Sequence, residues 1–299
     1  MSTRAGFVSV LGRPNAGKST FLNFICGQNL ALVSHKANAT RKRMNFIIMH
    51  TRQNMERTQI IFVDTPGIHK QEKLLNQFML QEAIKAMGDC DLNLFLAPAY
   101  DPTSYYQEFL LLNEDRPHLL LLTQCDKVSK TEVLQKIAEY DEFREKFLAL
   151  IPIECKDSFD FSPLLETISA HLPQSPLLYD EEILTTSNMR EIYKEIIRES
   201  LFENLSDEIP YESDVVIEKF IEKPTINKVF GRIIVEKDSQ KAIIIGKQAT
   251  TIKRIGRSAR EKLEALEGKK IFLQLNVVTQ KNWSKTKDGL KKIGYDFDF

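Results

Sequence analysis

The sequence predicts two domains, an α/β domain with a mostly parallel sheet between helices and then a smaller α+β domain. Short apolar runs alternate with helix-period segments first, the pattern breaks near residues 173–187, and a different order of elements follows. The two parts also differ in charge. Residues 215–299 contain 19 Lys and Arg against 10 Asp and Glu, a net charge of +9, whereas residues 1–214 contain 22 against 31, a net charge of −9.

The strands of the first domain are predicted from short, continuous apolar runs, which are typical of strands buried on both faces. These runs are Phe7–Leu11, Ile60–Val63, Leu92–Ala97, Leu119–Leu122 and Leu150–Ile153. Met44–His50 is a further candidate strand, joined to the second run by a polar turn. Pro173 and Pro176 end the last helix of this domain. We therefore predict a first domain at residues 1–172, a linker at 173–187 and a second domain at 188–299.

The second domain is predicted to have the order helix–strand–strand–helix–strand, with a last short helix. The expected helices cover residues 189–204, Thr251–Glu267 and 284–292. The expected strands are Val215–Ile221 and Phe230–Glu236, around a turn at Lys223–Asn227, and Lys270–Val278. This order predicts an α+β fold, and its positive charge favours a polyanionic partner over a merely solvated surface.

Composition excludes several classes of protein. The four cysteines form no C-x-x-C pair, which argues against a zinc site or a disulfide framework and favours reduced thiols in a cytosolic protein. The N-terminus lacks the pattern of a signal peptide, and no apolar run approaches the ~20 residues of a membrane-spanning helix. Peripheral contact with a membrane stays open.

A phosphate-binding loop follows the first strand. Residues Gly12–Ser19 match G-x-x-x-x-G-K-[ST] completely and lead from a predicted strand into a helix, the context that this motif requires. Backbone N–H groups and the helix N-terminus face the phosphates in such loops, and the glycines allow close approach. Lys18 would contact the β- and γ-phosphates, and Ser19 would offer a hydroxyl to Mg²⁺.

Two further segments fit a Mg²⁺-dependent switch. Asp64-Thr65-Pro66-Gly67 ends a predicted buried strand, where Asp64 can reach Mg²⁺ through water and the Gly67 N–H can sense the γ-phosphate. Thr40 lies in the polar segment Ser34–Arg43, and a loop threonine joins a Mg²⁺ shell only when γ-phosphate is present. In isolation, the first segment is also compatible with a capped turn and Thr40 with a solvated loop residue.

The next candidate segment would select which base a bound nucleotide carries. Leu119–Leu122 runs into Thr123-Gln124-Cys125-Asp126-Lys127, and a carboxylate at Asp126 can accept hydrogen bonds from N1–H and the 2-amino group of guanine. Adenine lacks both donors, so such a site discriminates strongly. The alternative is that Asp126 caps the following helix.

A second glycine loop lies in the basic domain. The apolar run Ile243–Ile245 precedes Gly246-Lys247-Gln248-Ala249, and the following helix carries Lys253, Arg254, Arg257, Arg260 and Lys262. This arrangement resembles the KH domain, whose G-x-x-G loop clamps single-stranded nucleic acid. Ala249 stands in the last glycine's place, where alanine penalises a positive φ. A solvated basic helix is the alternative. Trp283 is a candidate for base stacking or for core packing.

Over nearly its whole length, the chain resembles the Era-like group of translation-factor-type GTPases. That group has N-K-x-D where this sequence has Thr123–Asp126, so Asp126 is kept while Asn and Lys are replaced. The replaced side chains would bridge the phosphate loop and cover the base, so we predict guanine preference with weakened affinity. The group's S-A-x segment aligns with Glu154-Cys155-Lys156, and its K-x-Q-T-T-R switch segment with Lys36–Arg41.

The resemblance implies a slow GTPase and its ions. Ile68 follows Gly67 where Ras-like switches place a Gln, and His69 is a weak candidate for positioning water. Lys18, Thr40 and Gly67 are therefore expected as transition-state and switch contacts, with no certain catalytic side chain. Mg²⁺ would be held by Ser19, Thr40 and Asp64, and the resemblance implies K⁺ beside Asn15.

Together these interpretations give two sets of site residues. The expected GTP-binding residues are Gly12, Arg13, Pro14, Asn15, Ala16, Gly17, Lys18, Ser19, Thr20, Asp64, Thr65, Pro66, Gly67, Thr123, Gln124, Cys125, Asp126, Glu154, Cys155 and Lys156. The expected RNA-binding residues are Gly246, Lys247, Gln248, Ala249, Lys253, Arg254 and Arg257.

The resemblance also implies partners: GTP and GDP, the 3′ end of small-subunit ribosomal RNA, and the small ribosomal subunit, whose maturation the group assists. It implies a monomer in the cytoplasm with a fraction at the inner membrane face. Three alternatives stay open at this point: a nucleotide-gated RNA-binding placeholder with negligible hydrolysis, an ATP-using enzyme, and a membrane-associated cell-division switch.

Overall fold

The structure is a computed structural model that describes residues 2–27, 41–68, 74–156, 158–183, 185–186, 188–206 and 209–295. It divides into two compact units, the first built mainly from residues up to 186 and the second from residue 187 onward. None of the described helices is both long and apolar enough to cross a bilayer. The four cysteines are free thiols.

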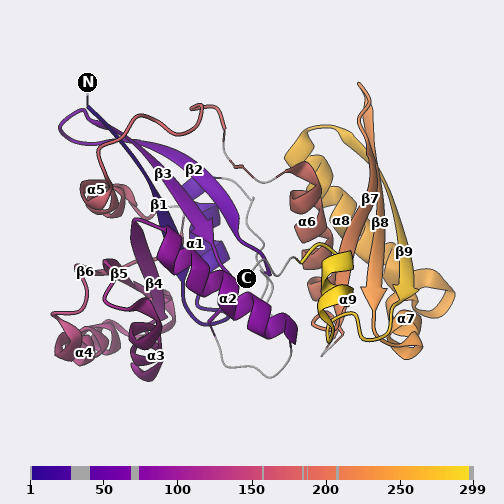
Figure 1. The fold of residues 1–299 in the computed structure, drawn as a ribbon, viewed down its shortest axis with the longest axis horizontal. Coiled ribbons are helices and arrows are strands. Elements are labelled where there is room, and N and C mark those ends of the chain that lie inside the picture. The colour runs from indigo at the N-terminus through magenta and orange to yellow at the C-terminus, as the bar shows by residue number, and fades with distance from the viewer. Residues whose placement is uncertain are drawn as a thin grey trace. The chain divides into compact units, whose positions relative to one another are not determined.

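The first unit has a six-stranded sheet in the order β2-β3-β1-β4-β5-β6 (Figure 1). Only β2 pairs antiparallel, with β3, and the other pairings are parallel. The strands are β1 Thr3–Leu11, β2 Met44–Thr51, β3 Arg57–Asp64, β4 Leu92–Pro98, β5 His118–Thr123 and β6 Ala149–Pro152. The helices are α1 Lys18–Cys26, α2 Leu74–Asp89, α3 Ser104–Asn113, α4 Lys130–Tyr140 and α5 Ser162–His171, with short 3₁₀ turns η1 Cys125–Lys127 and η2 Asp141–Phe143. All six predicted strands and the mostly parallel sheet are confirmed.

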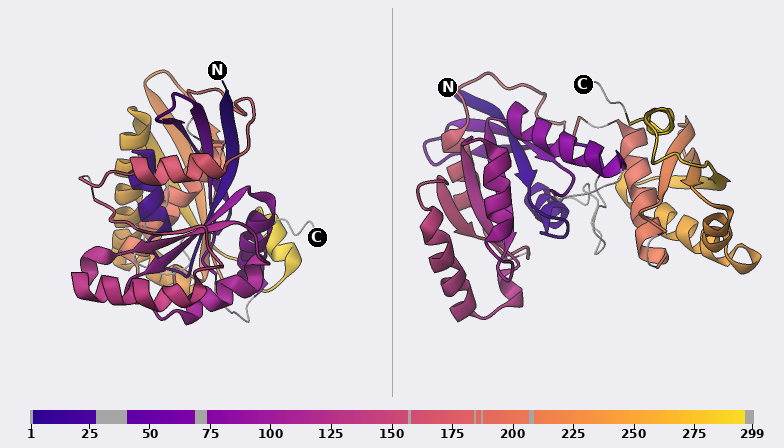
Figure 2. Two further views of the ribbon diagram at one scale, coloured as in Figure 1. Left: turned by 90° about the vertical axis from the view of Figure 1, so that its left-hand side faces the viewer. Right: turned by 60° about the horizontal axis from the view of Figure 1, so that its bottom comes forward.

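Helices cover both faces of this sheet, as the predicted fold requires (Figure 2). On one face, Phe21 of α1 packs edge-on against Phe62 of β3 and against Phe161 at the start of α5. On the other face, α2, α3 and α4 share one buried cluster with β1, β4 and β5. Burial on both faces explains why the strand sequences are continuously apolar rather than alternating.

The parallel strands all end at the same edge of the sheet. The segments after β1, β3, β4, β5 and β6 therefore emerge side by side, and this is where ligands bind in open α/β sheets. The motifs at Gly12–Ser19, Asp64–Gly67, Thr123–Asp126 and Glu154–Lys156 follow four of these strands. The topology thus brings together segments that lie more than a hundred residues apart.

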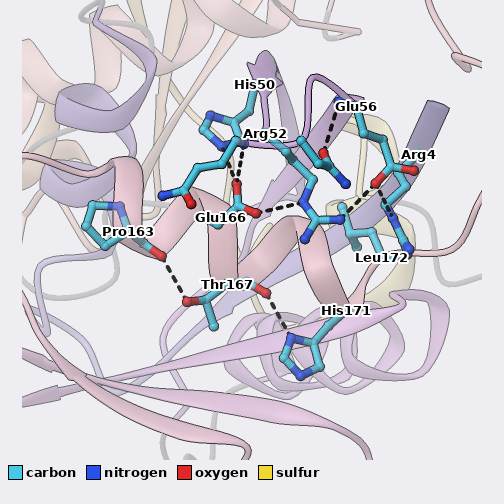
Figure 3. Close-up of polar contacts among 11 residues, drawn as sticks. Arg4, His50, Arg52, Glu56, Pro163, Glu166, Thr167, His171 and Leu172 are labelled. Carbon is cyan, nitrogen blue, oxygen red and sulfur yellow. Dashed lines mark hydrogen bonds and ion pairs between the residues drawn. The ribbon is translucent and has the colours of Figure 1, made fainter. Parts of the chain in front are cut away.

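A chain of ion pairs connects side chains at the sheet edge opposite to the motif-bearing segments (Figure 3). Glu56 accepts from Arg4 Nε at 3.0 Å and from Arg52 Nη1 at 2.8 Å, and Arg52 Nε donates to Glu166 at 3.0 Å. His50 Nε2 lies 3.4 Å from the same Glu166 carboxylate. The hydrogen bond from Arg4 holds the pKa of Glu56 below its usual value. These contacts tie α5 to the β2–β3 hairpin and to β1.

The segment after α5 also lies along the first unit. Residues Gln174 and Thr185 form isolated bridges with Arg4 and Phe46. The Gln59 side-chain oxygen accepts from the Leu178 and Tyr179 N–H groups at 2.9 and 3.0 Å. This segment therefore lies along the part of the sheet that β2, β3 and β1 form. The predicted bounds, with a first domain that ends at residue 172 and a linker that ends at residue 187, stay a prediction.

The second unit packs helices onto one three-stranded sheet, in the order β7-β8-β9 with β7–β8 antiparallel and β8–β9 parallel. Its elements are α6 Met189–Asn204, β7 Ser213–Ile221, β8 Ile226–Val235, α7 Asp238–Ile245, the 3₁₀ turn η3 Lys247–Ala249, α8 Thr250–Glu267, β9 Lys270–Thr279 and α9 Lys287–Lys292. Figure 1 shows α6 and α8 lying along the sheet, and their apolar residues share one buried core with it.

One detail of this unit differs from the sequence-based expectation, and another decides between two alternatives that the sequence left open. Helix α7 was not predicted: its apolar run Ile243–Ile245 is the end of a helix in which Ile244 is buried and Ile243 is 51% exposed. The order of elements is therefore helix–strand–strand–helix–helix–strand–helix. Trp283 is fully buried, which favours core packing over stacking on a base.

Candidate functional site

The phosphate loop has the backbone conformation that its glycines permit. Strand β1 ends at Leu11 and α1 begins at Lys18, with φ of 146° at Gly12 and 95° at Gly17. A Cβ on Gly12 would lie 2.7 Å from the Leu96 carbonyl oxygen, so a side chain there would collide with β4. Asn15 also has a positive φ, 63°, a conformation in which asparagine is several-fold enriched.

Lys18 lies inside this loop. Its side chain is only 8% exposed, and Nζ donates to the carbonyl oxygens of Gly12 at 3.2 Å and Arg13 at 3.1 Å. Burial lowers the pKa of Lys18 to about 8, an effect that the negative charge of Asp64 partly offsets. The ammonium is thus fixed in the concave face of the loop, where an anionic phosphate would restore the solvation that burial removes.

The Asp64–Gly67 segment packs directly on the phosphate loop. Asp64 is 1% exposed, and the Thr65 hydroxyl donates to the Val10 carbonyl at 2.7 Å. A Cβ on Gly67 would lie 2.7 Å from the Pro14 nitrogen, and the Ile68 N–H donates to the Gly12 oxygen at 3.1 Å. Only glycine fits at this contact, which gives Gly67 a structural requirement besides its proposed phosphate contact.

Two residues of this site carry side-chain oxygen atoms of the kind that Mg²⁺ binds. Asp64 offers a carboxylate, and Ser19 offers a hydroxyl from the first turn of α1, while Thr40, the third predicted ligand, lies outside the described residues. Mg²⁺ prefers such oxygen ligands and usually takes only one or two from the protein, with phosphates and water completing its shell. These residues therefore fit the ion. When bound, Mg²⁺ would neutralise charge on the β- and γ-phosphates.

The residues that replace the family's Asn and Lys still reach the phosphate loop. The Thr123 hydroxyl donates to the Ala16 carbonyl at 2.9 Å, and Gln124 Nε2 donates to the Asn15 carbonyl at 3.0 Å. Both side chains thus connect the loop after β5 to the loop after β1. The expectation of weakened nucleotide affinity stays a prediction.

Asp126 lies in η1 and does not cap α4. That cap is Ser129, whose hydroxyl accepts from the Glu132 N–H while the Glu132 carboxylate accepts from the Ser129 N–H. The alternative role for Asp126 is therefore wrong. Its carboxylate is exposed and makes neither a hydrogen bond nor an ion pair with any residue that the structure describes. It is available to a ligand.

Glu154–Lys156, the second segment predicted to contact the base, lies beside Asp126. The Ile153 N–H donates to the Leu122 carbonyl at 2.9 Å, which places Glu154–Lys156 next to the loop after β5. Burial raises the pKa of the Cys155 thiol to about 11, and the nearby negative charge of Asp126 contributes. Glu154 and Lys156 form an ion pair. The two segments predicted to hold the base, Thr123–Asp126 and Glu154–Lys156, are thus neighbours.

The residues after β4 also belong to this site, although no motif in the sequence marks them. Asp101 binds the Arg13 guanidinium through both carboxylate oxygens, with Nη2 to Oδ1 at 2.6 Å, and this bond raises the pKa of Arg13. The guanidinium also lies 5.9 Å from the ring centre of Tyr100 and 5.6 Å from that of Tyr105. The parallel topology contained the signal, because β4 ends at the same edge as the other motif-bearing strands.

Several predicted residues lie outside the described part of the chain. These are Thr40 and His69, together with most of the Lys36–Arg41 segment. Arg41 itself is buried, and Arg43 forms ion pairs with Glu82 at 3.2 Å and Asp89 at 3.0 Å, so neither is simply a solvated side chain.

The second glycine loop connects α7 to α8. Gly246 has φ 73°, and a Cβ there would lie 2.3 Å from the Thr251 hydroxyl oxygen. Gln248 and Ala249 also have positive φ, 51° and 61°, and the Ala249 N–H donates to the Gly246 oxygen at 3.1 Å. Ala249 therefore adopts the left-handed conformation that glycine would adopt there, at a cost of ~1–2 kcal/mol.

The basic side chains around this loop fall into two groups. Lys247 and Lys253 are exposed. Arg254 donates to the Asn204 carbonyl at the end of α6 at 2.7 Å, and Arg257 pairs with Glu261 at 2.8 Å. Lys262 is paired with Glu199 and Glu203. Arg254, Arg257 and Arg260 are exposed as well, so the positive charge that a polyanion could meet extends from the loop along α8.

Two family models match the chain. Residues 7–124 match the model described as 50S ribosome-binding GTPase, and residues 196–284 match the KH domain. The chain is 55% identical to GTPase Era of Helicobacter pylori strain P12 over 99% of this chain and 98% of that protein. It is 48% identical to GTPase Era of Campylobacter concisus strain 13826 over 98% of this chain and 100% of that protein.

Two solved structures are similar along the whole chain, each with a TM-score of 0.92. One is a variant of Aquifex aeolicus Era bound to GDP and AlF4⁻, 28% identical over 98% of this chain and 100% of that one. The other is Era in complex with MgGDPNP and nucleotides 1506–1542 of 16S ribosomal RNA, 29% identical over 99% of this chain and 100% of that one.

Proposed function

The chain belongs to the GTPase Era family, and from that premise we propose that it is a GTP-hydrolysing switch that binds the 3′ end of small-subunit ribosomal RNA through its KH domain and assists maturation of the small ribosomal subunit. The observation that carries the proposal is the convergence of four segments. The Lys18 loop, Asp64–Gly67, Thr123–Asp126 and Glu154–Lys156 meet at one edge of the sheet.

Each segment has a distinct role in this proposal. Backbone N–H groups of the phosphate loop from Asn15 to Ser19 and Lys18 Nζ bind the phosphates, and Ser19 and Asp64 hold Mg²⁺; one relative binds MgGDPNP. Asp126 accepts from guanine N1–H and the 2-amino group, while Glu154–Lys156 supply backbone contacts to the base. Gly67 senses the γ-phosphate through its N–H, and Thr40 completes the switch.

Hydrolysis is proposed to be slow, because Ile68 takes the place where Ras-like switches have a water-positioning glutamine. The protein then contributes positioning and charge, mainly through Lys18 and the backbone N–H groups. We also propose that K⁺ binds beside Asn15 and accelerates turnover. Equal hydrolysis rates in sodium and potassium buffers would contradict this role of the ion.

In the second domain, RNA is proposed to bind at Gly246–Ala249 and the start of α8. The loop allows close approach of a phosphate backbone, and Lys247 and Lys253 supply charge without sequence specificity. We further propose that the protein is a cytoplasmic monomer with a fraction at the inner membrane. Binding to single-stranded RNA and to anionic vesicles at matched salt would separate an RNA-binding role from a membrane role.

The guanine assignment is tested by equilibrium binding of fluorescent GDP, ADP and XDP with Mg²⁺ to wild type and Asp126→Asn. We expect wild type to prefer GDP and the variant to prefer XDP, because the amide donates to the oxygen that xanthine has in place of the 2-amino group. Equal binding of ADP and GDP, unaffected by the substitution, would favour the ATP-using alternative. Multiple-turnover phosphate release excludes the non-hydrolysing placeholder.

A further inference from the structure

Tyr100 is held between two loops of the nucleotide site. On one side, the Ala99 N–H donates to the Thr123 carbonyl at 2.9 Å, and on the other, Asp101 binds Arg13 of the phosphate loop. The backbone on both sides of Tyr100 is therefore anchored. Its side chain remains 48% exposed. Its ring lies beside the Arg13 guanidinium, and this contact alone does not account for the hydrogen bond of its hydroxyl.

The Tyr100 hydroxyl contacts the side chain that replaces the family's lysine. It donates to Gln124 Oε1 at 2.9 Å, and Lys127 Nζ donates to the same oxygen at 2.5 Å. Gln124 Nε2 donates to the Asn15 carbonyl at 3.0 Å. The opposite orientation of the carboxamide would place its NH₂ group against an ammonium and its oxygen against a carbonyl. The three partners therefore fix one orientation.

This orientation makes Gln124 a bridge between the base side and the phosphate side of the site. A glutamine at a half-exposed position otherwise samples several rotamers, and fixing it costs conformational entropy. Its backbone is also in the left-handed region, with φ 56°. Tyr100 and Lys127 restrict the side chain before nucleotide arrives, so less entropy is lost when the loops close on the base.

We propose that Tyr100 is a positioning residue of the nucleotide site, which together with Lys127 orients the Gln124 carboxamide so that it holds the base-recognition loop against the phosphate loop. This inference rests on the proposed guanine-nucleotide site. Loss of the Tyr100 hydroxyl lets Thr123–Asp126 separate more easily from Asn15. We expect this loss to speed nucleotide release and to leave GTP hydrolysis unchanged, because the contacts of Tyr100 with described residues include neither Lys18 nor Asp64.

Stopped-flow dissociation of fluorescent GDP in Mg²⁺ buffer measures this role in the full-length protein. We expect Tyr100→Phe to raise the dissociation rate about 3- to 10-fold, the range that one net hydrogen bond supplies. The single-turnover hydrolysis rate at saturating GTP should stay within about two-fold of wild type. Tyr105→Phe is the matched control, because its ring lies beside the same Arg13 and its hydroxyl has no contact with Gln124.

A second background separates positioning from general stability. In Gln124→Leu the side chain offers Tyr100 neither a hydrogen-bond acceptor nor a donor, so adding Tyr100→Phe should leave the dissociation rate of that variant unchanged. The role of Tyr100 is contradicted by an unchanged rate in Tyr100→Phe alone, or by an equal rise in both backgrounds. A wild-type protein that binds no GDP would contradict the proposed function itself, which distinguishes the two failures.

Discussion

Two glycine loops in this chain each lead into a helix, and their surroundings differ. In the phosphate loop, Lys18 is 8% exposed and hydrogen-bonded to two loop carbonyls. Three side chains from the ends of two other strands hold that loop: Asp101 after β4, and Thr123 and Gln124 at the end of β5. In the Gly246–Ala249 loop, Lys247 and Gln248 are exposed, and the hydrogen bonds of the loop are made within it and with the two adjoining helices, α7 and α8.

The difference shows what each loop can recognise. A buried ammonium and fixed N–H groups require little reorganisation when a phosphate of the right shape arrives, so the first loop suits one small ligand. Exposed lysines on a short loop bind phosphates through long-range attraction that salt screens, so the second suits an extended backbone. The same kind of glycine loop thus serves specific recognition in one domain and electrostatic recognition in the other.

The strongest test of this contrast is Lys18→Ala. We expect GTP affinity to fall by roughly 100-fold or more, about 3 kcal/mol, because the variant would lose charge-assisted bonds to the β- and γ-phosphates in a buried site. Isothermal titration calorimetry measures the change. RNA binding without nucleotide is the internal control and should be unaffected. A loss below ten-fold would show that the backbone alone supplies phosphate affinity.

The phosphate loop and the sheet could be predicted because their signals are local. Gly12–Ser19 matches a complete motif, and each buried strand is one apolar run. Asp101, Tyr100 and Lys127 could not be found in this way, since their roles depend on side chains that meet across three parallel strands. Asp126 was ambiguous for a related reason: only the structure shows that Ser129 caps α4 and leaves Asp126 exposed.

A second test compares two glycines of the basic domain. Gly246→Ala should destabilise the protein by roughly 1–3 kcal/mol and weaken RNA binding, because its Cβ would meet Thr251 at 2.3 Å and φ is 73°. Gly256→Ala is the matched control inside α8, where the new Cβ has only an ordinary contact, 4.0 Å from Leu275. That change should stabilise by roughly 0.5–1 kcal/mol. Urea unfolding measures both; equal effects would exclude a special role for Gly246.

The helix before this loop shows a different limit of prediction. In α7 the three isoleucines Ile243–Ile245 have different exposures, from buried Ile244 to half-exposed Ile243. A short apolar run is compatible with a strand or a helix, so periodicity could not decide. Trp283 likewise required the structure, because a tryptophan in a basic segment suits either an RNA surface or the core where it lies.

Salt dependence sharpens the comparison at a smaller scale. RNA affinity should fall steeply with salt, and Lys247→Gln should weaken RNA binding about 3- to 10-fold at low salt. It should also reduce the slope of log K against log salt by about 0.7 to 1, the contribution of one phosphate contact. Fluorescence anisotropy across a salt series measures this. Lys269→Gln, at the other end of α8 and near Glu222, is the control. Equal slopes for wild type and Lys247→Gln would remove Lys247 from the interface.

The smallest expected effect concerns Ala249, which has φ 61°. Ala249→Gly should stabilise the protein by roughly 0.5–1 kcal/mol, because relief of a strain of ~1–2 kcal/mol exceeds the added entropy of glycine in the unfolded chain. Ala259→Gly, at a buried position inside the same helix, should instead destabilise by about 1 kcal/mol or more. Urea unfolding of both variants measures the difference. If Ala249→Gly also destabilises, the alanine stabilises the start of α8 by more than its strain costs, and the exposed loop is more rigid than the comparison with the phosphate loop implies.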